Sequence, residues 1–549
     1  MCEIYNPTRS KVHQGVLVRA DWGDVMGGVD SGPVTIVRQE TNITSGIEVT
    51  QKLIHAAKTL ASILRGTLGP RGLDKGLYKS NGEFAVTSDG ARILNDLLIK
   101  NPGAKLLVSL GKSQEEIIGD GVTSTVLLAG ALLDEAGRLI RKGVHPLTVI
   151  DGYLRAADVA VSVLEKEAIE CSIDDDEMLQ HVASTSLGGR SAGSDTKFAT
   201  MLVDALKQVT HETENGTRCD AEDILFDKLE DSTIGDTRLL SGMFWRKRIP
   251  MEQMTGIRKN VKVTLINCDI KQREIIRDLE IELQSAEDLA EFMQIQKQTN
   301  VDIAEKILAT GADIICSSGD VERSILHQLA VANKVVIHDL DHKQLIHLAQ
   351  ASGATIVDHF NDLSDKDLGL VGHYEGERWA ATDEVQDRVI FDECKGPIVT
   401  ILVGGAMGAE ETIRGMYDAL RATSLAITDG SLLHGGGSSH MLAAKFVIME
   451  SEKVADRTRL GMEAFARALE MIPWMLAANC GVNPLDALLE LRSVKSEGKN
   501  LIGVREDGSI GSVKNILEPA ESLLHGIMAA TETANSLLRC DQVISARGD

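Results

Sequence analysis

Apolar and polar positions follow three successive patterns along the chain. From about residue 46 to 153, apolar side chains recur every three or four positions, the spacing that places them on one face of a helix. Gly143 and Pro146 supply a stop signal at the end of one such run. This pattern predicts helices over 47–64, 103–118 and 124–143.

The period changes in the middle of the chain. Residues 154–235 continue as more highly charged helices, interrupted at 185–195. Beyond them, short β-rich runs alternate with helical stretches such as 301–311 and 342–353, which indicates a βαβ-type domain. The predicted strands are 261–268, 312–318, 334–339, 354–358 and 398–405.

The helical period returns after about residue 410 and continues almost to the end of the chain. The order helical, mixed, helical predicts a helical domain that is split in the sequence, with an α/β domain inserted into it. The two chain crossings between these domains would then form a connecting region. Residues 1–45 are polar and Gly-rich, and we expect a loose arm there with one short strand.

Composition narrows the class of protein. The 549 residues exceed what one hydrophobic core usually organises, so about two to four domains are expected. A hydrophobic share of 43% and a charged share of 25% are typical of a soluble globular protein. The net charge of −24 repels nucleic acid and anionic membrane, so we expect neither as a partner.

The cysteines and the lack of long apolar stretches indicate the cellular compartment in which the protein is expected. The first residues contain no apolar signal segment, and no stretch approaches the ~18 apolar residues that a membrane span requires. The eight cysteines are scattered without CxxC spacing, which favours reduced thiols over disulfides or a zinc site. These features predict a cytoplasmic protein.

A Gly-Asp-Gly turn precedes the helix predicted at 124–143. Glycines at 119 and 121 allow the backbone to approach a phosphate, and the following helix start offers free N–H groups. Asp120 could hold Mg²⁺, while Thr123 and Ser124 supply hydroxyls. Most such turns are simply turns, so this signal is weak alone. The nearby GKS is not a P-loop, because Leu106 stands where that motif requires glycine.

Three further segments have a structural and a functional interpretation. The sequence RGTLGPRGLDKGL at 65–77 is a rigid turn that also fits a helix C-cap. Asp89, in TSDGARIL, stands directly before a helix and fits an ordinary N-cap. HGGGSSHML at 434–442 suits backbone approach to a ring or ribose, but His440 occupies the last glycine position of a dinucleotide fingerprint.

Together and in this order, the motifs resemble those of the chaperonin family. TLGPRGLDK, TSDGA, GDGVTST, HGGGSSH and the series ALEMIP, AANCG and EP stand where that family has its signatures, and the similarity runs over about 47–546. The group II branch, the archaeal thermosome and eukaryotic cytosolic type, fits better than the bacterial type. The reasons are the absence of a Gly-Met-rich tail and an extra charged stretch at 269–296, where group II proteins carry a built-in lid.

The resemblance implies a multidomain α and α/β fold. It comprises a split helical equatorial ATPase domain, a hinged intermediate domain and an inserted α/β apical domain with a helical lid protrusion. The expected boundaries are an N-terminal arm at 1–45, equatorial parts at 46–153 and 429–549, intermediate parts at 154–235 and 381–428, and an apical domain at 236–380 with the lid at about 269–297.

The same resemblance implies an ATP-dependent molecular chaperone that uses ATP and Mg²⁺. Such proteins form double rings, usually eight-membered, and fold non-native client proteins in a cavity that closes upon ATP hydrolysis. Whether this chain would assemble with itself or with other subunits stays open. An alternative is a divergent assembly or scaffold subunit with weak or no ATPase activity. A small-molecule enzyme is disfavoured, because the inserted domain has no clustered His/Cys ligands and no GxSxG.

Site residues carry over from the family one by one. Asp89 and Asp418 would position and activate the attacking water, and Asp120 would coordinate Mg²⁺. Because phosphoryl transfer needs little covalent assistance, positioning and charge stabilisation would carry most of the catalysis. The remaining nucleotide-binding residues implied by the resemblance are Leu68, Gly69, Pro70, Gly119, Gly121, Val122, Thr123, Ser124, Arg190, Gly436, Gly437, Asn479, Gly481 and Glu518.

Three positions depart from the family pattern. Val122 replaces one of three hydroxyl residues, Arg190 replaces a lysine that senses the γ-phosphate, and Val403 replaces an arginine before a Gly-Gly pair. Exchange of lysine for arginine is not neutral at a tight site. The three carboxylates are retained, which predicts an active ATPase in which the departures act on the rate or on allosteric coupling.

The lid stretch has its own pattern. Ser285 and Asp288 form a plausible capping box at the start of a helix. A short apolar face on a charged helix either packs on its own domain or contacts other chains, and here we expect contact with neighbouring lids or with client protein. The residues on this face are Leu289, Phe292, Met293 and Gln296.

Overall fold

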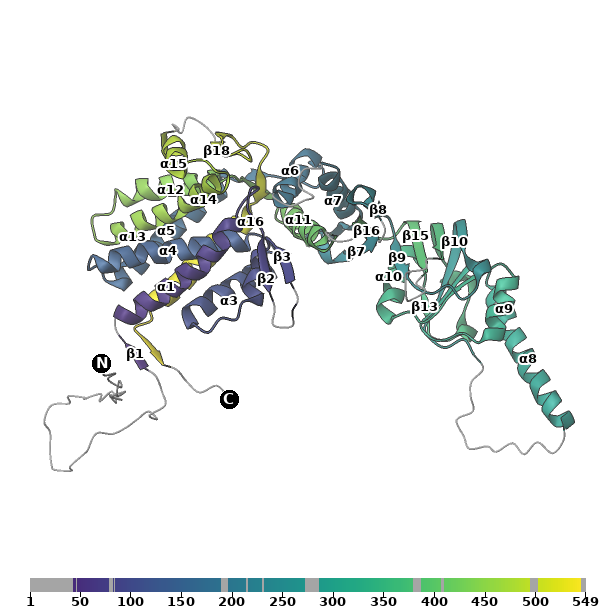
Figure 1. Ribbon diagram of the computed structural model, residues 1–549. Helices are drawn as coiled ribbons and strands as arrows, with labels where there is room; N and C mark the ends of the chain where they lie inside the picture. Colours follow the sequence, from purple (N-terminus) through teal and green to yellow (C-terminus); the bar gives the residue numbers. More distant parts are fainter. Residues whose placement is uncertain are drawn as a thin grey trace, which may run out of the picture.

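The computed structural model describes residues 43–45, 47–78, 82, 84–188, 196–213, 216–229, 232–271, 286–378, 387–405, 409–493 and 502–544. Within these ranges the chain forms three bodies in a row, each built around one large hydrophobic core (Figure 1). A helical body lies at one end, a smaller mixed body in the middle and a sheet-containing body at the far end. None of the described helices is long and apolar enough to cross a membrane.

The helical body is assembled from both ends of the sequence. Its amphipathic helices bury one shared core, in which Tyr153 donates a hydrogen bond to the carbonyl oxygen of Leu132 (2.6 Å) and meets the ring of Phe465 edge-on at 5.7 Å. Strands β1 (Ile43–Ser45) and β21 (Gln542–Ile544) pair antiparallel beside it. The main helices are α1 (Ile47–Leu64), α3 (Pro102–Ile117), α4 (Val122–Arg141), α5 (Pro146–Glu167), α12 (Ser438–Ser451), α13 (Thr458–Leu469), α14 (Met471–Asn479), α15 (Pro484–Ser493) and α16 (Ala520–Leu538).

Helix α5 crosses the domain boundary that was expected at residue 153. The helix continues without a break past residue 153, and its buried residues Ala156, Ala160 and Leu164 belong to the core of the helical body. A helix with one continuous apolar face belongs to the body whose core that face packs against. The helical body therefore extends to the end of α5 rather than ending at residue 153.

The middle body is also assembled from two separate segments. Its core joins residues of α6 (Asp176–Leu187) and α7 (Thr196–Val209) with residues of α11 (Ala409–Asp429). A small sheet completes this body, with β16 (Val399–Gly404) parallel to β7 (Ile224–Leu229) and antiparallel to β8 (Arg238–Leu240). The predicted strand at 398–405 thus lies here and not in the sheet of the third body.

The third body contains a mixed sheet. Strands β10 (Gly256–Ile266), β11 (Ile314–Ser317) and β12 (Val335–Ile337) run parallel, as the alternation of strands and helices predicts, and β13 (Ile356–Val357) also pairs parallel with β10. The other half of the sheet is antiparallel and was not among the predicted strands. It consists of β14 (Gly369–Glu377), β15 (Arg388–Cys394) and β9 (Met243–Arg246). Because β15 lies between β14 and β9, this body continues past the boundary expected at residue 380.

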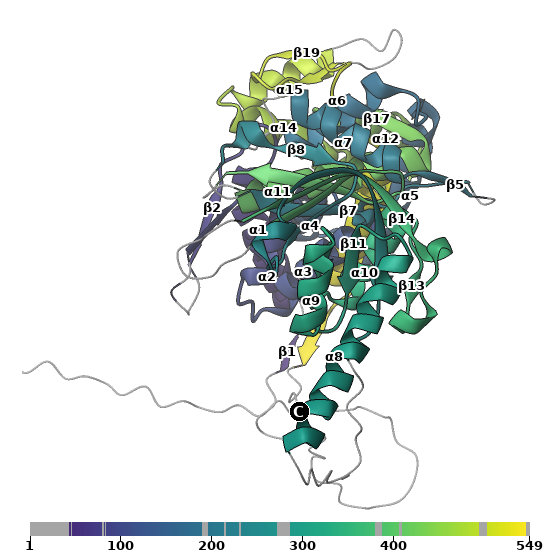
Figure 2. The ribbon, with the colours of Figure 1, turned by 90° about the vertical axis from the view of Figure 1, so that its right-hand side faces the viewer.

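Helices accompany the sheet of the third body. Helix α8 (Ala286–Ala309) packs on α9 (Arg323–Val331) near its C-terminal end and projects well beyond the sheet at its N-terminal end (Figures 1 and 2). Helix α10 (His342–Ser352) packs near β14 and β10. The predicted lid thus contains a projecting helix, but Ser285 of the capping box and the side chains of the apolar face lie outside the described residues.

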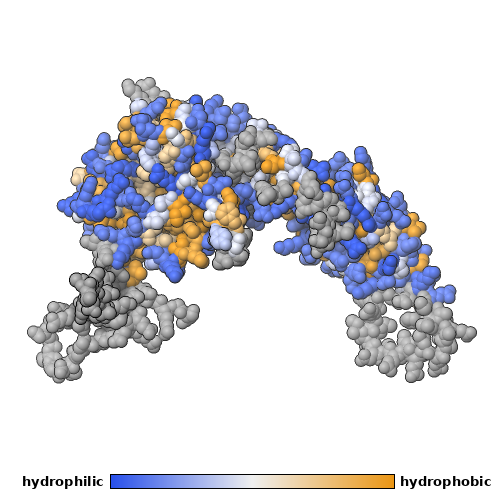
Figure 3. Space-filling view, viewed as in Figure 1, coloured by the Kyte–Doolittle hydropathy of each residue, from blue (hydrophilic) through white to orange (hydrophobic). Residues whose placement is uncertain are grey.

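Apolar side chains gather on one outer face of the helical body. Figure 3 shows such a concentration near α3 and the hairpin of β2 (Lys75–Tyr78) and β3 (Phe84–Thr87), and further hydrophobic areas elsewhere in the view. Phe84 and Val86 are exposed on the hairpin, and Leu98, before α3, is 98% exposed. Exposed apolar groups concentrated in this way are typical of surfaces that contact other chains.

Candidate nucleotide site

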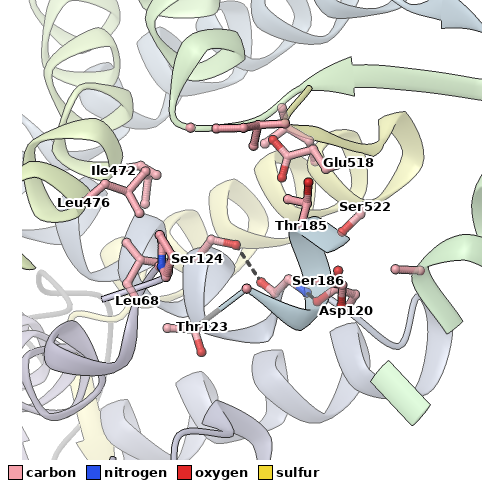
Figure 4. A pocket seen from close by; sticks show the side chains of 18 of the residues that line it. Leu68, Asp120, Thr123, Ser124, Thr185, Ser186, Ile472, Leu476, Glu518 and Ser522 are labelled. Atoms are coloured by element: carbon pink, nitrogen blue, oxygen red, sulfur yellow. Dashed lines mark hydrogen bonds between the residues drawn. The ribbon is translucent and has the colours of Figure 1, made fainter. Parts of the chain in front are cut away.

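A cavity of about 630 Å³ lies where the helical body meets the middle body. Its wall combines the loop after α1, the start of α2 (Gly90–Asp96), the turn before α4, the end of α6, one face of α11 and the start of α16. This volume lies within the range of about 300–1,000 Å³ that small-molecule sites occupy. Figure 4 shows Ile472 and Leu476 on one side of the cavity, with Asp120, Glu518 and Ser522 on the other.

The Gly-Asp-Gly turn requires both of its glycines. Gly119 and Gly121 have φ of 82° and 77°, in the left-handed region that other residues rarely adopt. A side chain would also be blocked, since a Cβ at Gly119 would lie 2.7 Å from Nε of Arg421, and one at Gly121 would lie 2.9 Å from Oγ of Ser522. The turn leads directly into α4, whose N-terminal N–H groups favour an anion there.

Gln114, which is fully buried, holds this turn in place. Its backbone carbonyl accepts hydrogen bonds from the N–H groups of Ile118 and Gly119, at 3.0 and 3.1 Å. Its side-chain Nε2 donates to the carbonyl oxygen of Asp120 (2.9 Å), and its Oε1 lies 2.7 Å from Nδ1 of His525 on α16. The position of Asp120 is therefore determined by hydrogen bonds of a buried glutamine that connect the turn with α3 and α16.

The first turn of α4 lines the cavity, and one of its residues, Val122, also belongs to the core. Thr123 and Ser124 line the cavity, and the Ser124 hydroxyl donates to the carbonyl oxygen of Gly121 at 2.9 Å (Figure 4). Val122 is only 6% exposed and belongs to the hydrophobic core, with Cγ1 directed towards Gly111 of α3. The departure at Val122 thus adds apolar packing in the core where the family has a hydroxyl.

Asp89 has two roles that sequence reasoning treated as alternatives. Its Oδ1 accepts a hydrogen bond from the N–H of Ala91 (2.9 Å), so it caps α2. Its carboxylate also lines the cavity, and Oδ2 lies 3.8 Å from Nε of Arg414 on α11. A residue can therefore serve as an N-cap and still present one carboxylate oxygen to a ligand.

Helix α11 brings the middle body to the cavity. Asp418 lines the cavity wall from this helix. One turn earlier, Arg414 forms an ion pair with Glu411 (3.3 Å), and Glu411 accepts a hydrogen bond from the hydroxyl of Thr87 at 3.2 Å. One turn later, Nη1 of Arg421 lies 3.5 Å from Oε1 of Glu115. The helix therefore meets the helical body through polar side chains on both sides of Asp418.

Burial shifts two titratable groups of the cavity wall. Burial chiefly, together with the nearby Asp120 carboxylate, raises the pKa of Glu518 to about 7. Burial alone lowers the pKa of His440 to about 4, so its ring is neutral at pH 7. Among the described residues, Nδ1 of His440 has no hydrogen-bond partner. Such shifts are common at functional sites because removal from water penalises the charged form.

Asn479 supports the cavity wall from behind. Its Nδ2 donates hydrogen bonds to the carbonyl oxygens of Arg65 (2.9 Å) and Leu68 (2.8 Å), which fixes the loop that carries Leu68. At 434–437, the backbone of Gly436 accepts a hydrogen bond from Val504 (2.9 Å), and a Cβ at Gly436 would lie 2.7 Å from the carbonyl oxygen of Val504. The glycine run thus serves close backbone packing beside the cavity.

Most of the expected site residues share this one cavity wall. Within the described part of the chain, the wall does not include Gly437, Asn479 or Gly481, and Arg190 lies outside the described residues. The expected residues that line the cavity are Leu68, Gly69, Pro70, Asp89, Gly119, Asp120, Gly121, Val122, Thr123, Ser124, Asp418, Gly436 and Glu518.

Sequence reasoning missed several residues of this site. Thr185 and Ser186 line the cavity at the end of α6, where the hydroxyl pair before the Gly-Gly of TSLGGR was the available signal. Gln114 and Arg414 carried no local signal, because the fold alone brings Gln114 to His525 and Arg414 to Asp89. Ser522, on the first turn of α16, lines the cavity as well.

Comparison with known proteins identifies the family. The model of the TCP-1/cpn60 chaperonin family matches residues 60–548, and the chain belongs to this family. It is 32% identical to thermosome subunit beta of Archaeoglobus fulgidus, over 95% of this chain and 96% of the relative. It is also 34% identical to a thermosome subunit of Methanocaldococcus jannaschii, over 94% and 95%, and 35% identical to one of Methanopyrus kandleri, over 90% and 91%.

These likenesses confirm the resemblance found in the sequence. The chain is a group II chaperonin subunit, one of a family of ATP-dependent chaperonins for protein folding.

Proposed function

We propose that the cavity binds ATP with Mg²⁺ and hydrolyses it, and that hydrolysis drives closure of a folding chamber. One observation carries this proposal: Asp89 and Asp120, on either side of α3, and the far more distant Asp418 line the same cavity. Two of them belong to the helical body, whereas Asp418 belongs to a helix of the middle body. Because the three carboxylates belong to two bodies, the rate of catalysis can depend on how the two bodies are placed relative to each other.

The donor set fits Mg²⁺ bound together with a nucleotide. No group of three or more metal-binding side chains occurs among the described residues, so the protein alone does not form a metal cage there. Mg²⁺ is usually held by one or two carboxylates, substrate phosphates and water. The Asp120 carboxylate, beside the helix start that receives the phosphates, fits this mode. When bound, Mg²⁺ neutralises charge on the phosphate oxygens.

The two sides of the cavity suit the two ends of ATP. The glycine turn, the N–H groups of α4 and the hydroxyls of Thr123 and Ser124 bind the phosphates. The apolar side chains of Ile472 and Leu476 pack against the base and ribose at the other side. The expected roles of Gly437, Asn479 and Gly481 are indirect, since these residues are not among those that line the cavity.

Hydrolysis is an in-line displacement at the γ-phosphorus. Water attacks this phosphorus, the bond to the bridging oxygen breaks, and ADP leaves as the water proton passes to a carboxylate. Asp418 orients the water from α11, and Asp89 assists from the start of α2. Because positioning and charge stabilisation account for most of the acceleration, the geometry of these two carboxylates controls the rate.

Assembly follows from the family and from the exposed apolar surface. We propose that the chain forms double rings with copies of itself or with related subunits, and that the exposed residues on the β2–β3 hairpin and near α3 contribute to subunit contacts. The projecting helix α8 forms part of the lid over non-native client proteins. The cytoplasmic location remains a prediction from the sequence.

A direct assay tests this function. Purified chain is incubated with ATP, with and without Mg²⁺, and released phosphate is measured alongside refolding of a denatured client protein. We expect Mg²⁺-dependent phosphate release and client refolding. Ring assembly without phosphate release would instead support the alternative of a scaffold subunit, which the three retained carboxylates disfavour.

A further inference from the structure

Arg421 on α11 rests directly on the Gly-Asp-Gly turn. Its Nη1 lies 3.5 Å from Oε1 of Glu115, which precedes the turn at the end of α3. Its guanidinium also fills the space beside Gly119, where an added Cβ would lie 2.7 Å from Nε and 3.0 Å from Cζ. The middle body thus reaches the turn that carries Asp120 through one cationic side chain.

Aromatic contacts support Arg421 from the other side. Its guanidinium carbon lies 5.6 Å from the ring centre of Tyr417, in cation–π contact. Tyr417 in turn meets the ring of Phe226 on β7 edge-on, with centroids 6.4 Å apart and an interplanar angle of 73°. A continuous series of contacts therefore runs from the small sheet of the middle body to the turn beneath the cavity.

The spacing along α11 connects this contact with catalysis. Arg421 follows Asp418 by three residues, so the two side chains lie on the same face of the helix. When the guanidinium is seated against Glu115 and Gly119, Asp418 is directed into the cavity. We propose that Arg421 is a positioning residue that, through Glu115 and Gly119, sets the distance of Asp418 from the bound nucleotide. This inference rests on the proposed ATPase function of the site.

The partial exposure of the ion pair between Arg421 and Glu115 indicates that the pair positions α11 rather than stabilises the fold. The side chains of Arg421 and Glu115 are 23% and 34% exposed, and ion pairs of that kind contribute little to folding. Small misplacements of a catalytic group nevertheless reduce turnover strongly. Loss of the pair should therefore lower the turnover rate while leaving ATP binding and folding nearly unchanged.

The test compares Arg421→Ala and Glu115→Gln with the unaltered protein, assembled as it is purified. Steady-state phosphate release gives kcat and KM, and titration with a fluorescent ATP analogue gives the nucleotide Kd. We expect each variant to lower kcat by about tenfold with the Kd within about twofold, and the double variant to be no slower than either single one. Arg421→Lys, which keeps the charge, should recover part of the rate.

A matched control lies on the same helix. Glu410 pairs with Lys228 of β7 at 2.6 Å, and this exposed pair stays within the middle body. Lys228→Ala therefore removes an ion pair of α11 without touching the turn, and it should leave kcat unchanged.

The outcomes separate this inference from the proposed function. Normal kcat in Arg421→Ala, an equal loss in the Lys228→Ala control, or a parallel tenfold loss of nucleotide affinity would each overturn the positioning role. If the unaltered chain released no phosphate, the proposed function itself would fail and this inference with it. An active chain with an unaffected Arg421→Ala variant would overturn the inference alone.

Discussion

The two walls of the nucleotide cavity are held in different ways. On the helical body, the turn around Asp120 is fixed by a fully buried glutamine and by glycines that admit no side chain. On the middle body, α11 reaches the same cavity through the partly exposed ion pairs of Arg414 with Asp89 and Arg421 with Glu115. Breaking a buried hydrogen bond costs about 1–3 kcal/mol, whereas an exposed ion pair contributes about 0–1 kcal/mol.

This difference assigns different tasks to the two walls. A rigid wall can bind nucleotide whatever the position of the rest of the chain. The ion pairs that join α11 to the helical body beside Asp418 can break without unfolding either body, and this helix carries a carboxylate that lines the cavity. Binding should therefore depend chiefly on the helical body, to which the middle body adds Thr185 and Ser186, whereas hydrolysis should require both walls.

The substitution Asp418→Ala is the most sensitive test of the different tasks of the two walls, and it has the largest expected effect. Asp418 is the only expected catalytic group on the wall that the middle body forms. Without its carboxylate, we expect kcat to fall by at least about 100-fold. The Kd for ATP should stay within about threefold, because the phosphate-binding groups belong to the other wall. Single-turnover phosphate release and nucleotide titration measure the two quantities. Normal turnover in this variant would show that Asp418 is not catalytic.

Asp89→Asn separates the catalytic and structural roles of Asp89. Asparagine caps a helix about as well as aspartate, so α2 should keep its N-cap. The negative charge is lost, and we expect kcat to fall by about 30-fold with the unfolding midpoint unchanged. Asp89→Ala is the companion variant, since it should lose about 1 kcal/mol of stability in addition. If Asp89→Asn hydrolysed ATP normally, the residue would be an N-cap only.

The wall formed by the helical body was easier to predict from the sequence than the wall formed by the middle body. Glycines, hydroxyls and Asp120 stand within one short turn, so their chemistry is visible locally. The helices around them have strict apolar spacing because each buries one face in a large core. The contribution of Asp418 came only from resemblance to the chaperonins, since nothing in its own segment indicates a nucleotide.

Other features required the fold itself. Strand β14 lies in a run rich in polar residues and glycine, and its burial alternates only in part, whereas β15 buries three consecutive residues and then turns polar. The hydrogen bonds of Gln114 with His525 and of Asn479 with Arg65 join residues that are more than 400 positions apart, at separations of 411 and 414. Long-range polar pairing leaves no periodic trace, and for that reason sequence patterns did not reveal it.

Gln114→Ala tests the rigidity of the fixed wall. The substitution leaves the carbonyl oxygen of Asp120 without its donor and removes a buried contact of His525, so we expect a loss of about 2 kcal/mol in the free energy of unfolding. Weaker Mg-ATP binding should accompany it. Gln298 on α8 bonds Asp302 at the surface, and Gln298→Ala should change neither quantity. Equal stability of the two variants in urea titrations would refute a rigid turn held by Gln114.

The smallest expected effect concerns how the free energy of unfolding depends on pH through His440 in the same wall. Because burial lowers the pKa of His440 to about 4, its ring binds a proton below about pH 6.5 only in the unfolded chain. The unfolded state then holds more protons, so stability is complete above that pH and is lost as the pH falls towards 4. Between pH 8 and pH 6 we expect this ring to account for a loss of about 1 kcal/mol.

His440→Gln should remove that part of the slope, while His342→Gln, at an exposed position on α10, should keep it. Urea unfolding at both pH values measures the difference. An unchanged slope in His440→Gln would mean that the ring can take up a proton within the folded wall, and the wall would then be less rigid than its hydrogen bonds indicate. A reduced slope would instead show that His440, like Gln114, stays buried for as long as this wall is folded.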